Sequence, residues 1–238
     1  MAADSRRDDG PVRLSDLSRA VLDALVESNP ELAAIRSEMI EAAGDLVRCW
    51  RSGGTLYLCG NGGSHADALH IAGELVKSFE RPRPLDEGLR EALERSPSPY
   101  GDELAGCLQA GLRTVTLGAN GAVATAIAND MSPAGIGFAQ ELAALGRAGD
   151  VLLVLSTSGT SRSAILAAVA ARALGMTVVA LVGRAPVGAP SDAAPTRLAD
   201  FADVAIAAPA EHTAEVQGWH VRIYHCLCGM VEEELFGP

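Results

Sequence analysis

Residues 149–161 read GDVLLVLSTSGTS, and this stretch decides the fold. The run from Val151 to Leu155 is continuously apolar, which is typical of a strand buried on both faces of a parallel sheet. The run ends in a turn of small hydroxyl residues, and a helical pattern follows it directly. This order of strand, turn and helix predicts one repeating unit of an α/β protein.

The same unit recurs along the chain. Short apolar runs predict further strands at residues 55–60, 113–118, 176–183 and 201–209. Helical patterns alternate with them at residues 64–79, 120–130, 137–146 and about 213–235. Strands that alternate with helices require right-handed crossovers, which place helices on both faces of a parallel sheet. We therefore predict a doubly wound α/β fold.

The domain organisation follows from composition shifts. Residues 1–13 are polar and are expected to be disordered, and residues 14–54 are expected to form N-terminal helices that pack on the domain and act in oligomerisation. Asn29 followed by Pro30 is a helix-start signal. Residues 55–238 form the main domain, interrupted by a charged, proline-punctuated insertion at about 80–112.

Composition excludes several classes of protein. The 238 residues are 48% hydrophobic and 21% charged, and no apolar stretch is long enough to span a membrane. The first residues show no secretory signal, so a cytoplasmic location is expected. An odd number of cysteines, five, argues for reduced thiols, with Cys226 and Cys228 packing in the core. The net charge of −11 argues against nucleic acid as a partner.

The turn STSGTS at residues 156–161, called the hydroxyl-rich turn below, is a candidate phosphate site. Free backbone N–H groups and the positive end of a helix dipole converge where a strand passes into a helix, and such a nest binds phosphate. The turn is neither a P-loop nor a dinucleotide fingerprint. A purely structural capping loop is the alternative. The glycine-rich GNGGS of residues 60–64 follows its own strand and is expected at the same edge of the sheet.

A second group of candidate residues lies on two apolar helices. His70 and Glu74 are one helical turn apart, so they share a face, and Gln217, His220 and His225 lie on the last helix. Burying such groups separately would be costly, so we expect His70, Glu74 and His225 to meet around a metal, a substrate or each other. Mixed imidazole and carboxylate ligands suit zinc. His220 has no assigned role beyond a surface or packing position.

Four segments in this order resemble one known family. CGNGGSHADALHIAGEL, AIAND, GDVLLVLSTSGTS and VQGWHVRIYHCLC are similar to the sugar isomerase (SIS) domain family and, within it, to the phosphoheptose isomerases. The resemblance covers about residues 20–236 apart from the insertion. It implies a flavodoxin-like three-layer sandwich, an activity on sedoheptulose 7-phosphate, a zinc ion, and a homotetramer with active sites between subunits.

The resemblance also implies roles for individual residues. The substrate would be bound by Asn61, Gly62, Gly63, Ser64, Glu74, Asn129, Asp130, Ser156, Thr157, Ser158, Ser161 and Gln217, with the four residues from 156 to 161 on the phosphate. The metal would be held by His70, Glu74, Gln217 and His225. Because Gln217 and His225 are eight residues apart, their backbones differ by about 12 Å along the helix axis, so Gln217 is the least secure ligand.

Aldose–ketose exchange moves a proton between neighbouring carbons through an enediolate. Glu74 is expected to move the carbon-bound proton and His225 to act as acid and base at the oxygens, with zinc as the Lewis acid. The expected product is D-glycero-heptose 7-phosphate, manno or altro, for heptose biosynthesis. No nicotinamide or flavin is required.

Two alternatives remain. The SIS family includes a non-catalytic tetramer that associates with the bacterial replication initiator, but its equivalents of Glu74 and His225 are not a carboxylate and an imidazole. The substrate could also be another sugar phosphate. Many family members carry a basic residue four positions after the glutamate, where this chain has Ser78 beside Lys77.

Overall fold

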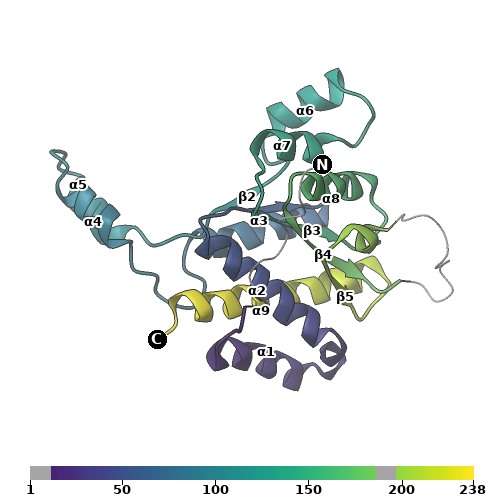
Figure 1. Cartoon of the computed structure of the whole chain (residues 1–238), viewed down its shortest axis with the longest axis horizontal. Coiled ribbons are helices and arrows are strands. Elements are labelled where there is room, and N and C mark those ends of the chain that lie inside the picture. Colours follow the sequence, from purple (N-terminus) through teal and green to yellow (C-terminus); the bar gives the residue numbers. More distant parts are fainter. Residues whose placement is uncertain (1–11, 186–196) are drawn as a thin grey trace.

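The computed structural model describes residues 12–185 and 197–238. Its centre is a parallel five-stranded sheet in the order β2-β1-β3-β4-β5 (Figure 1). The strands are β1 Leu56–Cys59, β2 Thr114–Thr116, β3 Val151–Ser156, β4 Thr177–Gly183 and β5 Val204–Ala208. Each of them lies within a run that the sequence predicts as a strand. The doubly wound α/β prediction is confirmed, and the order is that of flavodoxin-like sheets.

Helices cover both faces of the sheet (Figure 1). One layer is formed by α2 Arg36–Arg51, α3 Gly63–Val76 and α9 Thr213–Phe236, and α1 Asp16–Ser28 packs against the outer side of α9. The other layer is formed by α7 Gly137–Leu145 and α8 Arg162–Ala173, with α6 Gly121–Asp130 standing against α7. Successive strand residues point to opposite faces, so Leu153 enters the first apolar cluster and Leu152 the second.

The segment after Asn29 begins differently from the helix that Asn29 and Pro30 predict. Its first turns, Pro30–Ile35, form a 3-10 helix that precedes α2. The Asn29 side chain does not cap this segment. Its amide donates instead to the carbonyl of Leu25 at the end of α1. The expected disorder of residues 1–13 falls mostly on residues 1–11, which lie outside the described part of the chain.

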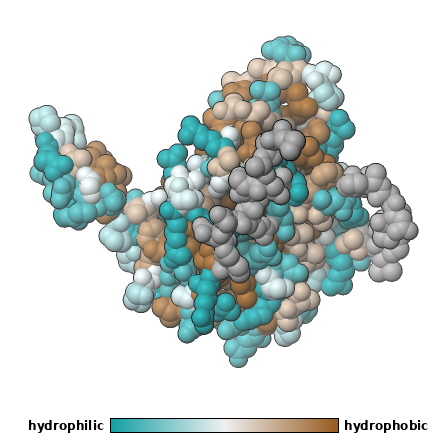
Figure 2. All heavy atoms as spheres, in the orientation of Figure 1, coloured by the Kyte–Doolittle hydropathy of each residue, from teal (hydrophilic) through white to brown (hydrophobic). Residues whose placement is uncertain are grey.

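The insertion forms a projecting arm. Helices α4 Glu87–Glu94 and α5 Gly101–Cys107 pack on each other away from the sheet (Figure 1). A single antiparallel bridge between Pro84 and Gln109 closes its base. Hydrophobic residues lie exposed on the arm (Figure 2). Its exposed large apolar side chains are Leu89, Tyr100, Leu104 and Leu108. In the described residues, no helix is long and apolar enough to cross a membrane.

A buried ion pair joins the base of the arm to the last helix. Arg83 Nε donates to Glu232 Oε1 at 2.8 Å, and the two side chains are 0% and 2% exposed. Glu232 also accepts the backbone N–H groups of residues 79, 80 and 81. Burial raises the pKa of Glu232, but these hydrogen bonds outweigh it and hold the pKa below its ordinary value.

Arg83 reaches beyond this pair to the end of α3. Its guanidinium donates to the carbonyls of Leu75 and Glu74, at 2.8 and 3.3 Å, and it lies over the ring of Phe236. The carbonyls at a helix end have no partner within the helix. Arg83 supplies a donor to the carbonyl of Glu74 and a second donor to that of Leu75, which also accepts the N–H of Leu112. One cation therefore ties α3, the arm and α9 together.

Removing one partner of this pair should destabilise the whole fold. Glu232→Gln leaves the buried guanidinium without a counter-charge, and we expect a loss of about 3–5 kcal/mol in the free energy of unfolding, measured by urea denaturation. Arg90 on the arm pairs with Glu87 and Glu94 at the surface. Arg90→Met is the matched control and should leave the urea midpoint unchanged. Equal effects of the two substitutions would contradict this assignment.

Candidate active site

The loops that follow β1 and β3 are joined by one amide. Asn61 Nδ2 lies 2.9 Å from Ser161 Oγ and 2.9 Å from Ser163 Oγ. These strands are adjacent, and beyond them the sheet continues in opposite directions, to β2 on one side and to β4 and β5 on the other. This is the switch point at which open α/β sheets bind ligands. The expectation that the GNGGS and STSGTS turns share one edge of the sheet is confirmed.

The glycines after β1 leave room for a side chain from α9. Gly62 has φ of +57°, a conformation that favours glycine. A Cβ atom on Gly63 would come within 2.0 Å of Gln217 Nε2, so the Gln217 amide lies directly against this backbone. Ser64 is buried at the start of α3. Gln217 therefore lies with the residues predicted to bind substrate, and its role as a metal ligand stays a prediction.

The hydroxyl-rich turn is closed by its own side chains. Ser156 Oγ accepts the N–H of Gly159, and Ser158 Oγ accepts the N–H of Thr160. The carbonyl of Thr157 accepts from the N–H of Gly183 at the end of β4. Ser161 is the residue before α8, so its hydroxyl lies at the positive end of that helix dipole. These contacts are compatible with both a capping loop and a phosphate nest.

A cation lies behind the same turn. Arg197 Nη2 donates to the carbonyl of Ser158 at 3.2 Å and lies 3.7 Å from the Cβ position of Gly159. No sequence motif predicts a basic residue here, because Arg197 is 39 positions from Ser158 and belongs to no recognisable pattern. Positive charge beside a turn rich in hydroxyl groups favours an anionic ligand.

His70, Glu74 and His225 come together between α3 and α9. His70 Nε2 is 3.3 Å from Glu74 Oε1 and 3.4 Å from His225 Nε2. Helix geometry explains the first distance, since the two residues are one turn apart. The second is a tertiary contact across 155 residues. The prediction that these three side chains meet is confirmed.

Neighbouring residues set the charge of this cluster. Lys77 Nζ donates to Glu74 Oε2 at 2.8 Å, and this hydrogen bond lowers the pKa of Glu74. Burial, followed by the nearby charge of His70, lowers the pKa of His225. Phe79 stacks on the His225 ring, with centroids 5.5 Å apart. At neutral pH the cluster therefore contains an ionised carboxylate and a neutral imidazole.

Tyr224 supports His70 from the opposite side. Its hydroxyl is 2.9 Å from His70 Nδ1 and 3.5 Å from Asp67 Oδ1. Burial and the charge of Asp67 raise the pKa of Tyr224, so the phenol keeps its proton. Neither Tyr224 nor Asp67 was singled out in the sequence, because a tyrosine within an apolar helix reads as a core residue.

The donor atoms fit zinc in their chemistry and spacing. Ligands at about 2.0–2.1 Å from a tetrahedral zinc lie about 3.3–3.4 Å from one another. The distances from His70 Nε2 to Glu74 Oε1 and His225 Nε2 match this value. No complete set of three or more His, Cys, Asp or Glu ligands is formed within residues 12–185 and 197–238. One chain thus supplies two pairs of possible ligands, His70 with Glu74 and His70 with His225.

The cluster lies further along α3 than the glycine-rich turn of residues 60–64, which Asn61 joins to the hydroxyl-rich turn. Gln217 meets Gly63, and eight residues further along α9 His225 meets His70, so the two helices run in the same direction. From Gly63 to His70 the axis of α3 advances about 10 Å. A ligand that contacts both groups of residues must therefore be extended.

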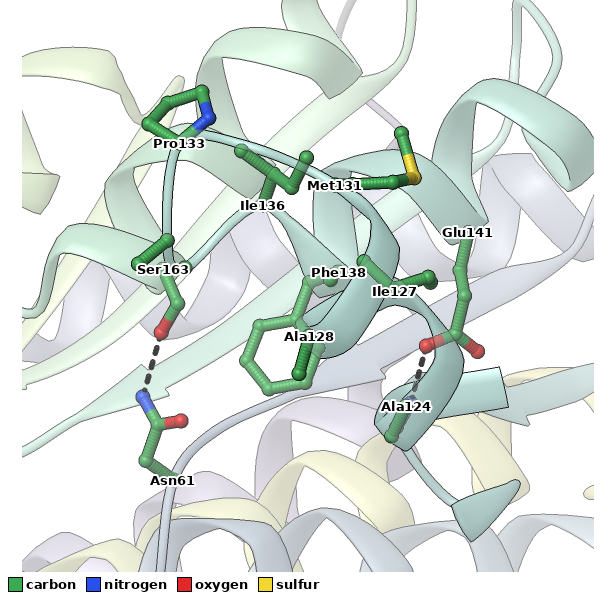
Figure 3. A pocket seen from close by; sticks show the side chains of 14 residues that line it. Asn61, Ala124, Ile127, Ala128, Met131, Pro133, Ile136, Phe138, Glu141 and Ser163 are labelled. Carbon is green, nitrogen blue, oxygen red and sulfur yellow. Dashed lines mark hydrogen bonds between the residues drawn. The ribbon is translucent and has the colours of Figure 1, made fainter. Parts of the chain in front are cut away.

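Asn129 and Asp130 lie apart from both groups. They end α6, are exposed, and form a hydrogen bond with each other at 2.7 Å. Beside them is a cavity of about 290 Å³ whose wall includes Asn61, Ser163 and Phe138 (Figure 3). Glu141 lines the same cavity and accepts the N–H of Gly118. The substrate-binding role of Asn129 and Asp130 stays a prediction.

Comparison with known proteins agrees with this architecture. A family model described as the SIS domain matches residues 22–98 and 101–183. The chain is 37% identical over 215 residues to the phosphoheptose isomerase of Methylococcus capsulatus, with 90% of this chain and 93% of that protein covered. This chain belongs to the SIS domain family.

Other relatives of this SIS domain carry the same name. The phosphoheptose isomerase of Thiobacillus denitrificans is 36% identical over 204 residues, covering 86% of this chain and 87% of that protein. Among solved structures, phosphoheptose isomerase GmhA from Neisseria gonorrhoeae has a TM-score of 0.65 at 28% identity, covering 90% of this chain and 96% of that chain. The enzyme from Francisella tularensis has the same TM-score and coverage at 29% identity.

His220 is a packing residue of this SIS domain. It is fully buried on α9, and neither ring nitrogen has a hydrogen bond of ordinary geometry, although the ring lies beside the backbone of Val182. Burial disfavours the charged imidazole and lowers the pKa of His220 to about 4. The alternative of a surface position is excluded.

His220 should make the fold sensitive to acid. Its pKa is lower in the folded than in the unfolded chain, so the unfolded chain binds the extra proton as pH falls below about 6.5. Between pH 7 and pH 4 this costs about 3 kcal/mol of stability. Urea unfolding of the wild type and His220→Phe should show a difference that changes by this amount over that range. A difference that stays constant with pH would contradict the assignment.

Proposed function

We propose that this protein is a phosphoheptose isomerase that converts sedoheptulose 7-phosphate to D-glycero-heptose 7-phosphate, manno or altro. The observation that carries the proposal is the meeting of Glu74 with His70, and of His70 with His225, on the helix that follows the glycine-rich turn. Asn61 of that turn contacts Ser161 of the hydroxyl-rich turn at the switch point of the sheet. The relatives named phosphoheptose isomerase support the reaction class.

The charge states suit aldose–ketose exchange. Glu74, whose pKa is lowered by Lys77, is ionised at neutral pH and can take a proton from the carbon beside the carbonyl. His225, whose pKa is lowered by burial, is neutral and can exchange a proton with the substrate oxygens. Glu74 then returns its proton to the neighbouring carbon, which completes the isomerisation without net gain or loss of protons.

The advance of about 10 Å along α3 from Gly63 to His70 is comparable to the length of a seven-carbon substrate. An extended chain advances about 1.2 Å per bond, and eight bonds separate C1 from phosphorus in a heptose 7-phosphate, which gives about 10 Å. The phosphate would lie on Ser158 and Ser161, with Arg197 behind the turn. C1 and C2 would then lie at the cluster, where the proton transfer takes place.

We further propose that His70, His225 and Glu74 hold a zinc ion, with Gln217 as the least secure ligand. The metal would supply Lewis-acid polarisation of the carbonyl. Ligand pairs that share His70 are what a site completed by a second subunit would show, and a homotetramer with sites at its interfaces is part of the proposal. The enzyme is expected in the cytoplasm, without nucleic-acid or membrane partners.

Two alternative functions can be distinguished from this proposal by testing turnover of sedoheptulose 7-phosphate. A non-catalytic SIS tetramer needs neither carboxylate nor imidazole at the cluster, whereas here both are present and in contact through His70. An isomerase of another sugar phosphate would keep the chemistry. Lys77 pairs with Glu74, whereas many family members place a basic residue one position later, so the change bears on the sugar more than on the reaction.

Substitution of the two proton-transfer residues should abolish turnover of sedoheptulose 7-phosphate. We expect kcat to fall by about 10²–10⁴-fold in Glu74→Gln and in His225→Ala, because each removes a positioned acid or base. The measurement is product formation by metal-free protein with and without added Zn²⁺. Glu91→Gln and His212→Ala change exposed residues of the same types and should retain wild-type kcat. Full activity in either cluster variant would refute the assignment.

The phosphate turn should affect binding more than chemistry. Loss of one hydrogen bond to a charged group costs about 1.5–3 kcal/mol, so Ser161→Ala should raise KM for the sugar phosphate roughly 10–100-fold while kcat changes little. Ser52→Ala removes a hydroxyl that bonds to Arg48 and Cys49 at the end of α2 and serves as the control. An unchanged KM in Ser161→Ala would place the phosphate elsewhere.

A further inference from the structure

The side chain of His70 is held from behind by a phenol and a carboxylate. His70 turns Nε2 toward Glu74 and His225, and its other ring nitrogen, Nδ1, lies 2.9 Å from the hydroxyl of Tyr224. That hydroxyl is also 3.5 Å from Asp67 Oδ1, at the long end of the hydrogen-bond range. Asp67, Tyr224 and His70 thus form a linear chain that leads into the cluster.

The direction of the two hydrogen bonds of Tyr224 follows from the fact that its hydroxyl has a single proton to donate. As a carboxylate Asp67 can only accept, and its second oxygen, Oδ2, is buried without a partner. If Tyr224 donated to His70 Nδ1, the single phenolic proton would be used there and Asp67 would lose the donor on its other oxygen. Asp67 is half-buried, and leaving both oxygens of its carboxylate without a donor would be costly. The balanced arrangement has Tyr224 donating to Asp67 and His70 Nδ1–H donating to Tyr224.

We propose that Tyr224 is a positioning residue that holds His70 in the Nδ1–H tautomer, so that the Nε2 lone pair faces Glu74 and His225. The inference deepens the proposed function, on which it rests for the use of that lone pair. A lone pair on Nε2 is what a metal ligand or a proton acceptor must present. Partners behind a ligating histidine usually fix its tautomer and ring orientation.

The ring of Tyr224 contributes separately from its hydroxyl. It meets the rings of His70 and His225 edge to face, with centroids 5.5 and 4.8 Å apart, and the residue is 1% exposed. Tyr224→Phe keeps this packing and removes only the oxygen. A matched control exists on the other face of the sheet, where the buried Tyr57 donates its hydroxyl to the carbonyl of Leu145.

The tautomer can be read directly by nitrogen-15 NMR of the imidazole rings in the full-length protein without added metal. His70→Gln assigns the His70 signals by their loss. We expect wild-type His70 to carry its proton on Nδ1, Tyr224→Phe to shift toward the Nε2–H form, and Tyr57→Phe to match the wild type. A wild-type His70 in the Nε2–H form, or an unchanged tautomer in Tyr224→Phe, would overturn the proposal.

A second readout uses Zn²⁺ itself, in competition with a chelator. Loss of a partner behind a ligand typically weakens metal binding about 10–100-fold, and we expect this for Tyr224→Phe but not for Tyr57→Phe. Equal Zn²⁺ affinity of Tyr224→Phe and the wild type would count against the positioning role. The tautomer measurement needs no turnover, so an inactive wild type with the Nδ1–H form would refute the proposed function and leave the role of Tyr224 supported.

Discussion

The carboxylate of Glu232 is the contact on which the site depends. It lies inside the protein with Arg83 as counter-charge and three backbone N–H groups as donors. Arg83 in turn holds the carbonyls at the end of α3, one of which belongs to Glu74. The last helix and the helix that carries His70 are therefore fastened together next to the residues that must act jointly. Buried charges are expensive unless paired in this way, which makes the arrangement specific.

Local features of the fold were predictable from the sequence because they depend on neighbours in the chain. The five strands follow from apolar runs such as residues 151–155, and the contact of His70 with Glu74 follows from helical spacing. The edge at which the two turns meet follows from the direction of parallel strands. The 3-10 start after Asn29 was missed, because Asn29 uses its side chain on the preceding helix.

Contacts between residues far apart in the sequence could not be predicted from local sequence patterns. Arg83 looked like one more charge in a charged insertion, yet its partner is 149 residues away and both are buried. Tyr224 follows apolar residues on α9 and could not be distinguished from a core tyrosine without the positions of Asp67 and His70. The position of Arg197 could not be predicted either, because only the tertiary fold places it behind the hydroxyl-rich turn.

The arm formed by α4 and α5 leaves and rejoins the body at Pro84 and Gln109, which are paired with each other. Its two ends therefore meet at one point, and the backbone on either side of that point keeps its own hydrogen bonds, from Ala110 to Arg83 and from Leu112 to Leu75. Such a segment behaves as an exchangeable module. Because these contacts lie at its base, the arm could be lengthened or shortened beyond Pro84 and Gln109 while the hydrogen bonds that hold the body stay in place.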